Sequence, residues 1–75
     1  MEKISERLKE LRLSKNLNYK GIERESGINY KSFYNWETGA SFPTTKFLII
    51  LAKFFNVTSD YLLGLDEDIQ EDNKN

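Results

Sequence analysis

Apolar residues in the first part of the chain recur at the spacing of an α-helix. Ile4, Leu8 and Leu11 stand three or four positions apart in a segment of strong helix formers. A helix with this spacing has one apolar face and one polar face. The pattern therefore predicts an amphipathic helix over about residues 3–15, which ends at Lys15-Asn16.

Residues suited to helix ends divide the middle of the chain into two shorter helices. Asn18 and Asn29 have side chains that can accept hydrogen bonds from the first turn of a helix. Gly27 and Gly39 suit the left-handed conformation in which many helices end. The predicted helices run from Tyr19 to about Ser26 and from the Asn29 cap through about Glu37.

The remaining pattern predicts two further helices. After a loop over residues 40–43, Thr44 is placed to cap a fourth helix, whose apolar residues again repeat at helical spacing. A short fifth helix is expected after Thr58, and it closes at Gly64. Because no segment shows strand-period alternation of useful length, the pattern indicates an all-α domain.

Length and composition agree with one small folded domain. A chain of 75 residues has room for a single core, and its 39% hydrophobic content is too high for a disordered chain. The chain has no cysteine, so helix packing must hold the fold without disulfides. It has no membrane-length apolar run and no export leader, so we expect a cytoplasmic protein.

The net charge of -1 hides an asymmetry along the chain. Residues 1–64 carry ten Lys and Arg against seven Asp and Glu, whereas residues 65–75 carry one lysine against five acidic residues. We therefore expect a basic domain over residues 1–64 and an acidic flexible tail or linker stub over residues 65–75.

The two middle helices have the spacing of a helix-turn-helix unit. Ile22 and Phe33 are placed to close the inner face between the helices, with Ile28 and Trp36 beside them. Gly27 is expected to allow a sharp turn that a side chain would obstruct. In such a unit the second helix can enter the major groove of DNA.

Three stretches of the chain carry a family resemblance. They read ISERLKELR, LNYKGIERESGINYKSFYNWETG and FPTTKFLIILAKFFNVTSDYLLG, and together they cover roughly residues 4–64. In these stretches the chain resembles the lambda-repressor-like (Cro/repressor, XRE-type) helix-turn-helix domains of phage repressors and bacterial regulators. The resemblance implies a compact five-helix fold. It also implies a sequence-specific, double-stranded-DNA-binding transcriptional regulator, expected to be a repressor of phage or mobile-element type.

The face that reads DNA follows from helix geometry. If Phe33 points inward, the outward arc of the same helix is free to meet bases, and the resemblance implies base contacts at the same places. Asn35 suits a bidentate pair with adenine, Lys31 can donate to guanine, and a tyrosine can meet a thymine methyl group or a phosphate. The alternative is that these are ordinary exposed polar residues. The expected base contacts, all in the helix over residues 30–36, are Tyr30, Lys31, Tyr34 and Asn35.

Affinity is expected mainly from contacts with phosphates. For Lys20 and Lys46 the alternative is a solvated surface charge. The resemblance implies that Arg12 packs against Glu37 and is oriented toward DNA, whereas the alternative is two independent surface charges. The expected phosphate contacts are Arg12, Tyr19, Lys20, Asn29, Thr38, Ser41 and Lys46.

Three residues depart from the pattern of the family. Tyr19 stands where a Gln usually bridges a phosphate and the recognition helix. Glu23 stands where a small Ala is usual, so we expect its carboxylate to be paired or to reach solvent. Ser26 replaces a usual apolar residue and is expected to thin the core.

The resemblance also implies two-fold dimers on half-sites about one helical turn apart. Candidates for the interface are apolar residues near the end of the domain, although Phe55 and Val57 are equally suited to the core. The tail resembles a hinge to a C-terminal domain, so both a longer regulator and a complete small protein fit. The expected interface residues are Phe54, Phe55, Val57, Tyr61 and Leu65.

Other function classes fit the chain less well. Without His or Cys, the usual nucleophile–base pairs and soft metal sites are lacking, so we expect no enzyme, no metal and no cofactor. A protein-binding module, such as an antitoxin or anti-repressor, remains the alternative because the same fold can grip a protein. Dependence of binding on salt and on Lys31 and Asn35 separates the two classes.

Overall fold

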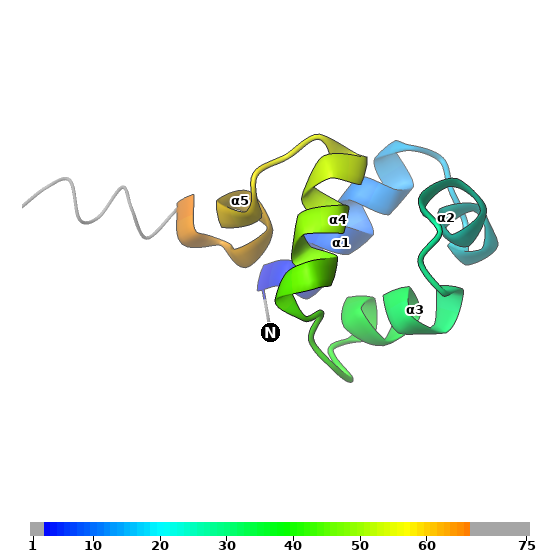
Figure 1. Ribbon diagram of the computed structural model, residues 1–75, viewed down its shortest axis with the longest axis horizontal. Helices are drawn as coiled ribbons and strands as arrows, with labels where there is room; N and C mark the ends of the chain where they lie inside the picture. The colour runs from blue at the N-terminus through cyan, green and yellow to red at the C-terminus, as the bar shows by residue number, and fades with distance from the viewer. Residues whose placement is uncertain (1–2, 67–75) are drawn as a thin grey trace, which may run out of the picture.

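A computed structural model describes residues 3–66 of the chain, which form five helices and, within that range, no strand (Figure 1). The expected all-α, five-helix fold is confirmed, and each predicted helix lies within a residue or two of its expected bounds. The helices are α1 (Lys3–Ser14), α2 (Tyr19–Ser26), α3 (Tyr30–Thr38), α4 (Thr45–Phe55) and α5 (Ser59–Leu63).

The helices enclose one core. Helix α1 packs against α3 and α5, α2 packs against α3, and α4 packs against α5. In Figure 1, α2 and α5 lie on opposite sides of the central α1 and α4, and α3 runs along the lower edge. The core side chains therefore come from all five helices and from the turn between α2 and α3. They are Ile4, Leu8, Ile22, Ile28, Phe33, Trp36, Leu51, Phe55 and Leu62.

Side-chain caps begin most of the helices, as the sequence predicts. The Asn18 side chain accepts a hydrogen bond from the backbone N–H of Gly21 at 2.8 Å, and Thr58 accepts one from Tyr61 at 3.0 Å. Thr44 occupies the N-cap position of α4 in an extended conformation, but its side chain makes no cap hydrogen bond. The prediction for Thr44 therefore holds for its position and is wrong for its hydrogen bond.

The turn between α2 and α3 depends on backbone conformation. Gly27 has a φ of 82°, and a Cβ atom built there would meet nothing within 4 Å. The expectation that a side chain would obstruct the turn is therefore wrong, because it is the left-handed backbone that favours glycine here. The Ser26 hydroxyl donates to the Ile22 carbonyl at 2.7 Å and accepts from the Ile28 N–H at 3.1 Å. Ser26 was expected only to reduce apolar packing in the core, but its hydroxyl group also satisfies backbone polar groups at the end of α2.

The first helix ties the two ends of the described chain together. Arg7 donates to the Tyr61 carbonyl at 2.6 Å and to the Asp66 carboxylate at 2.9 Å, and its guanidinium lies 4.1 Å from the centre of the Tyr61 ring. The tail expected from residue 65 onward therefore still contacts the domain at Asp66, and the rest of that tail lies outside the described residues. Over residues 3–66 no helix has the length and apolar character needed to span a membrane.

Candidate nucleic-acid interface

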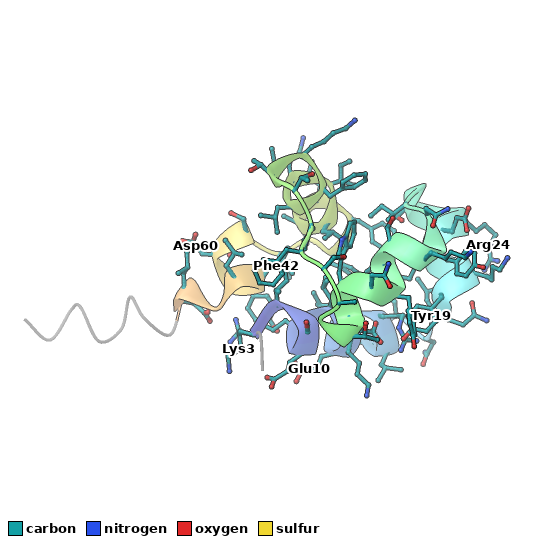
Figure 2. All side chains as sticks on the ribbon, turned by 90° about the horizontal axis from the view of Figure 1, so that it is seen from below. Lys3, Glu10, Tyr19, Arg24, Phe42 and Asp60 are labelled. Atoms are coloured by element: carbon teal, nitrogen blue, oxygen red, sulfur yellow. The ribbon has the colours of Figure 1, made fainter. Side chains whose placement is uncertain are left out.

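Helix α3 has a buried face and an exposed face. Phe33 is fully buried and Trp36 is 5% exposed, so both belong to the core. Lys31, Tyr34 and Asn35 are exposed on the opposite side of the helix. Figure 2 views the molecule from below, with α3 in front of the rest of the domain. The structure therefore places three of the four candidate base-contact residues on a free helical face, and the fourth, Tyr30, is half-exposed.

The start of α3 is fixed by Asn29. The side-chain oxygen of Asn29 accepts hydrogen bonds from the backbone N–H groups of Lys31 at 2.9 Å and Ser32 at 3.4 Å. The predicted structural role of Asn29 as a cap is therefore confirmed. The cap uses the amide oxygen, so the NH2 group of the same side chain is not consumed by it.

A charged cluster connects α1, the start of α2 and the end of α3. The Arg12 guanidinium donates to both carboxylate oxygens of Glu37, at 2.8 and 3.0 Å, and to the Leu17 carbonyl at 2.9 Å. The Tyr19 hydroxyl donates to the same carboxylate at 2.6 Å. The cluster lines a hollow between α1 and the end of α3. The expected pairing of Arg12 with Glu37 is present in the structure. The hydrogen bond from the Tyr19 hydroxyl to Glu37 does not follow from the sequence pattern.

The charged groups of Arg12 and Glu37 are largely buried within the protein. The side chains of Arg12 and Glu37 are only 11% and 4% exposed. Arg12 is therefore left with little surface for the phosphate contact expected from the sequence, and the hydroxyl proton of Tyr19 is already donated to Glu37. The hydrogen bond with Glu37 raises the pKa of the Arg12 guanidinium above its ordinary value. Because the Glu37 carboxylate is buried and paired, the acidic residue of α3 presents no free negative charge to DNA.

The Tyr19 phenol gives this cluster a pH dependence. Burial raises the phenol pKa, and the hydrogen bond to Glu37 raises it further. A phenol in an unfolded chain titrates at about pH 10, so above that pH the unfolded state releases this proton before the folded state does. The stability contributed by the raised pKa is therefore complete below about pH 10 and falls as the pH rises further.

Comparison of the wild type with Tyr19→Phe tests this pH dependence. The stability advantage of the wild type over the variant should be constant below about pH 10 and should shrink above it. Urea unfolding followed by Trp36 fluorescence at a series of pH values measures both free energies. Because the two proteins share every other titratable group, an advantage that stays constant above pH 10 would contradict the raised pKa of the Tyr19 phenol.

The two tyrosines of the exposed face rest on side chains from α2. The Tyr34 ring meets the Tyr19 ring edge to face, with centroids 5.3 Å apart and planes at 81°. The Lys20 ammonium lies 4.5 Å from the centre of the Tyr30 ring. Figure 2 labels Tyr19 beside α3. Both aromatic residues of the candidate reading face are thus supported by the preceding helix.

The other candidate contacts flank this face. Lys20 is exposed on α2. Thr38, Ser41 and Lys46 are exposed at the end of α3, in the following loop and in the first turn of α4. Glu23 is half-exposed, which agrees with the expectation that its carboxylate reaches solvent. The flanks of α3 therefore carry exposed hydrogen-bond donors and positive charge.

The candidate dimer residues divide into two groups. Phe55 is 8% exposed and its ring packs against Phe33, with centroids 6.2 Å apart, so Phe55 belongs to the core. Its assignment to the interface is corrected for that reason. Phe54, Val57 and Tyr61 are half-exposed. Phe54 and Val57 also pack against the core, and the Arg7 guanidinium lies over the Tyr61 ring. Leu65 is 40% exposed and is the most accessible of the candidates.

A comparison with protein families matches a model described as a helix-turn-helix domain to residues 5–66. Among curated proteins, the chain is 33% identical over 64 residues to the HTH-type transcriptional activator BcrR of Enterococcus faecalis. It is 33% identical over 63 residues to the uncharacterized HTH-type transcriptional regulator YobD of Bacillus subtilis. It is 34% identical over 64 residues to the HTH-type transcriptional regulator ImmR of the same organism.

These matches cover most of this chain but only part of each relative. The alignments include 84–85% of the chain, and 31%, 56% and 50% of BcrR, YobD and ImmR respectively. No solved structure gives a significant match. The family match covers most of α1 and all of α2 to α5, including the buried and exposed faces of α3 described above. The chain therefore belongs to the XRE-type, lambda-repressor-like helix-turn-helix family.

Proposed function

We propose that this chain binds double-stranded DNA sequence-specifically and regulates transcription by placing the exposed face of α3 in the major groove of an operator. The observation that carries the proposal is that α3 is buried on one face and exposed on the other. Phe33 and Trp36 anchor the helix in the core, while Lys31, Tyr34 and Asn35 project from its free side. An anchored helix with polar and aromatic groups on its free face has the form needed to read base edges.

The chemistry of the exposed face assigns a role to each side chain. Asn35 offers an amide that can pair with adenine through two hydrogen bonds, and Lys31 offers an ammonium group to guanine O6 and N7. Tyr30 and Tyr34 offer rings to thymine methyl groups or hydroxyls to phosphates. Each well-formed bidentate contact contributes about 1–3 kcal/mol to discrimination between bases.

Contacts with phosphates supply most of the proposed affinity. Lys20 and Lys46 provide the positive charge, and the amide NH2 group of Asn29 provides a donor at the start of α3. Ser41 provides a hydroxyl group beyond the other end of the helix, and Thr38 becomes available there when its hydroxyl gives up the 3.3 Å hydrogen bond that it donates to the Asn35 carbonyl. Arg12 acts as a positioning residue, because its guanidinium holds Glu37 at the end of α3.

The proposed assembly is a homodimer on DNA, with two copies of α3 in half-sites about one helical turn apart. The exposed parts of Phe54, Val57, Tyr61 and Leu65 are the proposed contacts between copies. The chain spans about a third to a little over half of the relatives it matches, which leaves room for a further C-terminal domain in a longer protein.

The proposed direction of regulation is repression, and the proposed origin is a phage or mobile element. A domain bound across a promoter blocks access of the polymerase without any further contact. One relative is named as an activator, so the helix-turn-helix domain by itself does not determine the direction. The proposed function needs no catalytic step and no cofactor, because base reading depends only on groups that the chain already carries.

Salt dependence of DNA binding tests the proposed function. Fluorescence anisotropy measures the affinity for a duplex selected from a random pool. Two lysine–phosphate contacts per protomer make four in the proposed dimer, and four contacts predict roughly a hundredfold weaker binding between about 50 and about 200 mM salt. Lys20→Ala should lower the slope of log affinity against log salt by about one per protomer, about two for the dimer, whereas Asn35→Ala should weaken the preference for the selected duplex and leave the slope unchanged.

Lys53→Ala is the matched control for Lys20→Ala. Lys53 is an exposed lysine in the last turn of α4, at the end of that helix away from α3 in Figure 1. Its removal changes the net charge by the same amount and should leave the salt slope unchanged. If the affinity for the duplex changes neither with salt concentration nor with Asn35→Ala, the result would favour a protein-binding module instead.

A further inference from the structure

One base-reading candidate differs from the others in how it is held. Tyr34 is 49% exposed, yet its ring meets the Tyr19 ring edge to face at a centroid distance of 5.3 Å. An edge-to-face pair at this distance is an attractive contact with a preferred geometry. The other side of the Tyr34 ring therefore faces solvent, and the contact with Tyr19 restricts the orientation of the ring.

Tyr19 is itself held by three contacts. Its hydroxyl donates to Glu37 at 2.6 Å, and the Arg12 guanidinium lies 4.3 Å from the centre of its ring. The Phe33 ring packs against it, with centroids 6.4 Å apart. These partners belong to α1 and α3, so the position of the Tyr19 ring is tied to the helix that carries Tyr34.

We propose that Tyr19 is a positioning residue for specificity, which holds the Tyr34 ring against the methyl group of one thymine in each half-site. This inference rests on the proposed function, since it requires α3 to lie in the major groove. It also replaces the phosphate contact expected for Tyr19, because the hydroxyl proton of Tyr19 is donated inside the protein to Glu37.

The surroundings of Tyr34 favour a methyl group as its target. Tyr34 shares the exposed face of α3 with Lys31 and Asn35, which both suit base edges. The thymine methyl is the apolar group that base pairs display in the major groove. A ring already restrained by a neighbour loses less conformational entropy when it contacts that group. Tyr30 is the internal comparison, because its ring is paired with the Lys20 ammonium and, within residues 3–66, with no aromatic ring.

Replacement of thymine by uracil isolates the methyl group. The selected operator is synthesised with uracil at one thymine position at a time, symmetrically in both half-sites, and affinities are measured by anisotropy. At one position the wild type should bind the thymine duplex about fourfold more tightly per half-site, the factor expected for burying one methyl-sized group. Tyr34→Ala should abolish this thymine-to-uracil ratio, which identifies the position that Tyr34 reads.

Two substitutions at Tyr19 separate its ring from its hydroxyl. Tyr19→Leu removes the ring and should bring the ratio at that position close to one. Tyr19→Phe keeps the ring, along with its contacts to Arg12, Phe33 and Tyr34, and should keep the ratio. Tyr30→Ala is the matched control on the same helix and should leave the ratio at the Tyr34 position unchanged.

The ratio is insensitive to a general loss of folding. Both duplexes are titrated with the same protein sample, so a reduced folded fraction weakens both affinities equally and cancels. A ratio that survives Tyr19→Leu, or that is lost to the same extent in Tyr19→Phe, would overturn the role of the Tyr19 ring. Specific binding of the wild type with no thymine-to-uracil difference anywhere would overturn the methyl contact. Absence of any specific duplex would instead count against the proposed function itself.

Discussion

Replacing Phe33 with alanine is expected to lower the free energy of unfolding by about 4 kcal/mol, within the range for large-to-small changes at fully buried aromatic residues. The Phe33 side chain is fully buried and packs against the rings of Trp36 and Phe55. Because small domains are only marginally stable, this loss removes most of the stability available. Urea unfolding monitored by circular dichroism measures the change.

Lys31→Ala provides the control for this effect on the same helix. Lys31 is exposed and two residues from Phe33, so its removal should change the free energy of unfolding by no more than about 0.5 kcal/mol. The contrast between the two substitutions tests whether α3 has one structural face and one free face. Similar destabilisation by both would mean that the exposed face of α3 is engaged in the fold.

Replacing Glu37 with alanine is expected to cost about 3 kcal/mol of stability, because it leaves the buried Arg12 guanidinium without its partner. Glu37 accepts two hydrogen bonds from Arg12 and one from Tyr19, and all three are lost. The 11% exposure of the Arg12 side chain places the expected cost at the lower end of the range for broken buried pairs. Thermal and urea unfolding both measure it.

A double-mutant cycle separates the pair from its surroundings. The variant Arg12→Ala with Glu37→Ala removes both charges, so it should be less destabilised than the sum of the single substitutions. Glu37→Gln keeps an acceptor for Arg12 and Tyr19 without the negative charge, and it should fall between the wild type and Glu37→Ala. Strictly additive single and double variants would show that Arg12 and Glu37 act independently in solution.

The helices could be predicted from the sequence because their ends are encoded locally. Asn18, Asn29 and Thr58 each accept a hydrogen bond from the first turn of the helix they precede, and Gly27 adopts the left-handed conformation that ends α2. Such signals depend on residues only a few positions apart. Thr44 shows the limit of this reasoning, since the residue type and position were right and the side-chain bond is missing.

The division of apolar residues between core and surface could be predicted less well. Helix α4 carries apolar side chains around much of its circumference, so periodicity alone does not separate Phe54 from Phe55. The packing of Phe55 against Phe33, which the sequence does not reveal, shows that Phe55 belongs to the core. The Ser5 hydroxyl, which donates to the Trp36 carbonyl at 2.8 Å, was likewise not anticipated. A buried serine in an amphipathic helix gives no sequence signal for a partner on another helix.

The candidate site was predicted in outline and not in its internal contacts. Helix geometry places Lys31, Tyr34 and Asn35 on one arc without any knowledge of the fold. The contacts of Tyr19 with Glu37 and Tyr34 join residues on different helices, and they depend on how α2 crosses α3. The family pattern, with a Gln at this position, pointed to a phosphate contact that the observed hydrogen bond argues against.

Selection of bound duplexes from a random DNA pool tests the central claim most directly. With the wild type, the proposed reading face predicts a consensus with two-fold symmetry and half-sites about one helical turn apart. With Asn35→Ala, an otherwise similar consensus should lose its preference at one adenine in each half-site. A pool that shows no consensus with the folded wild type, or the same consensus with and without the Asn35 side chain, would contradict the account.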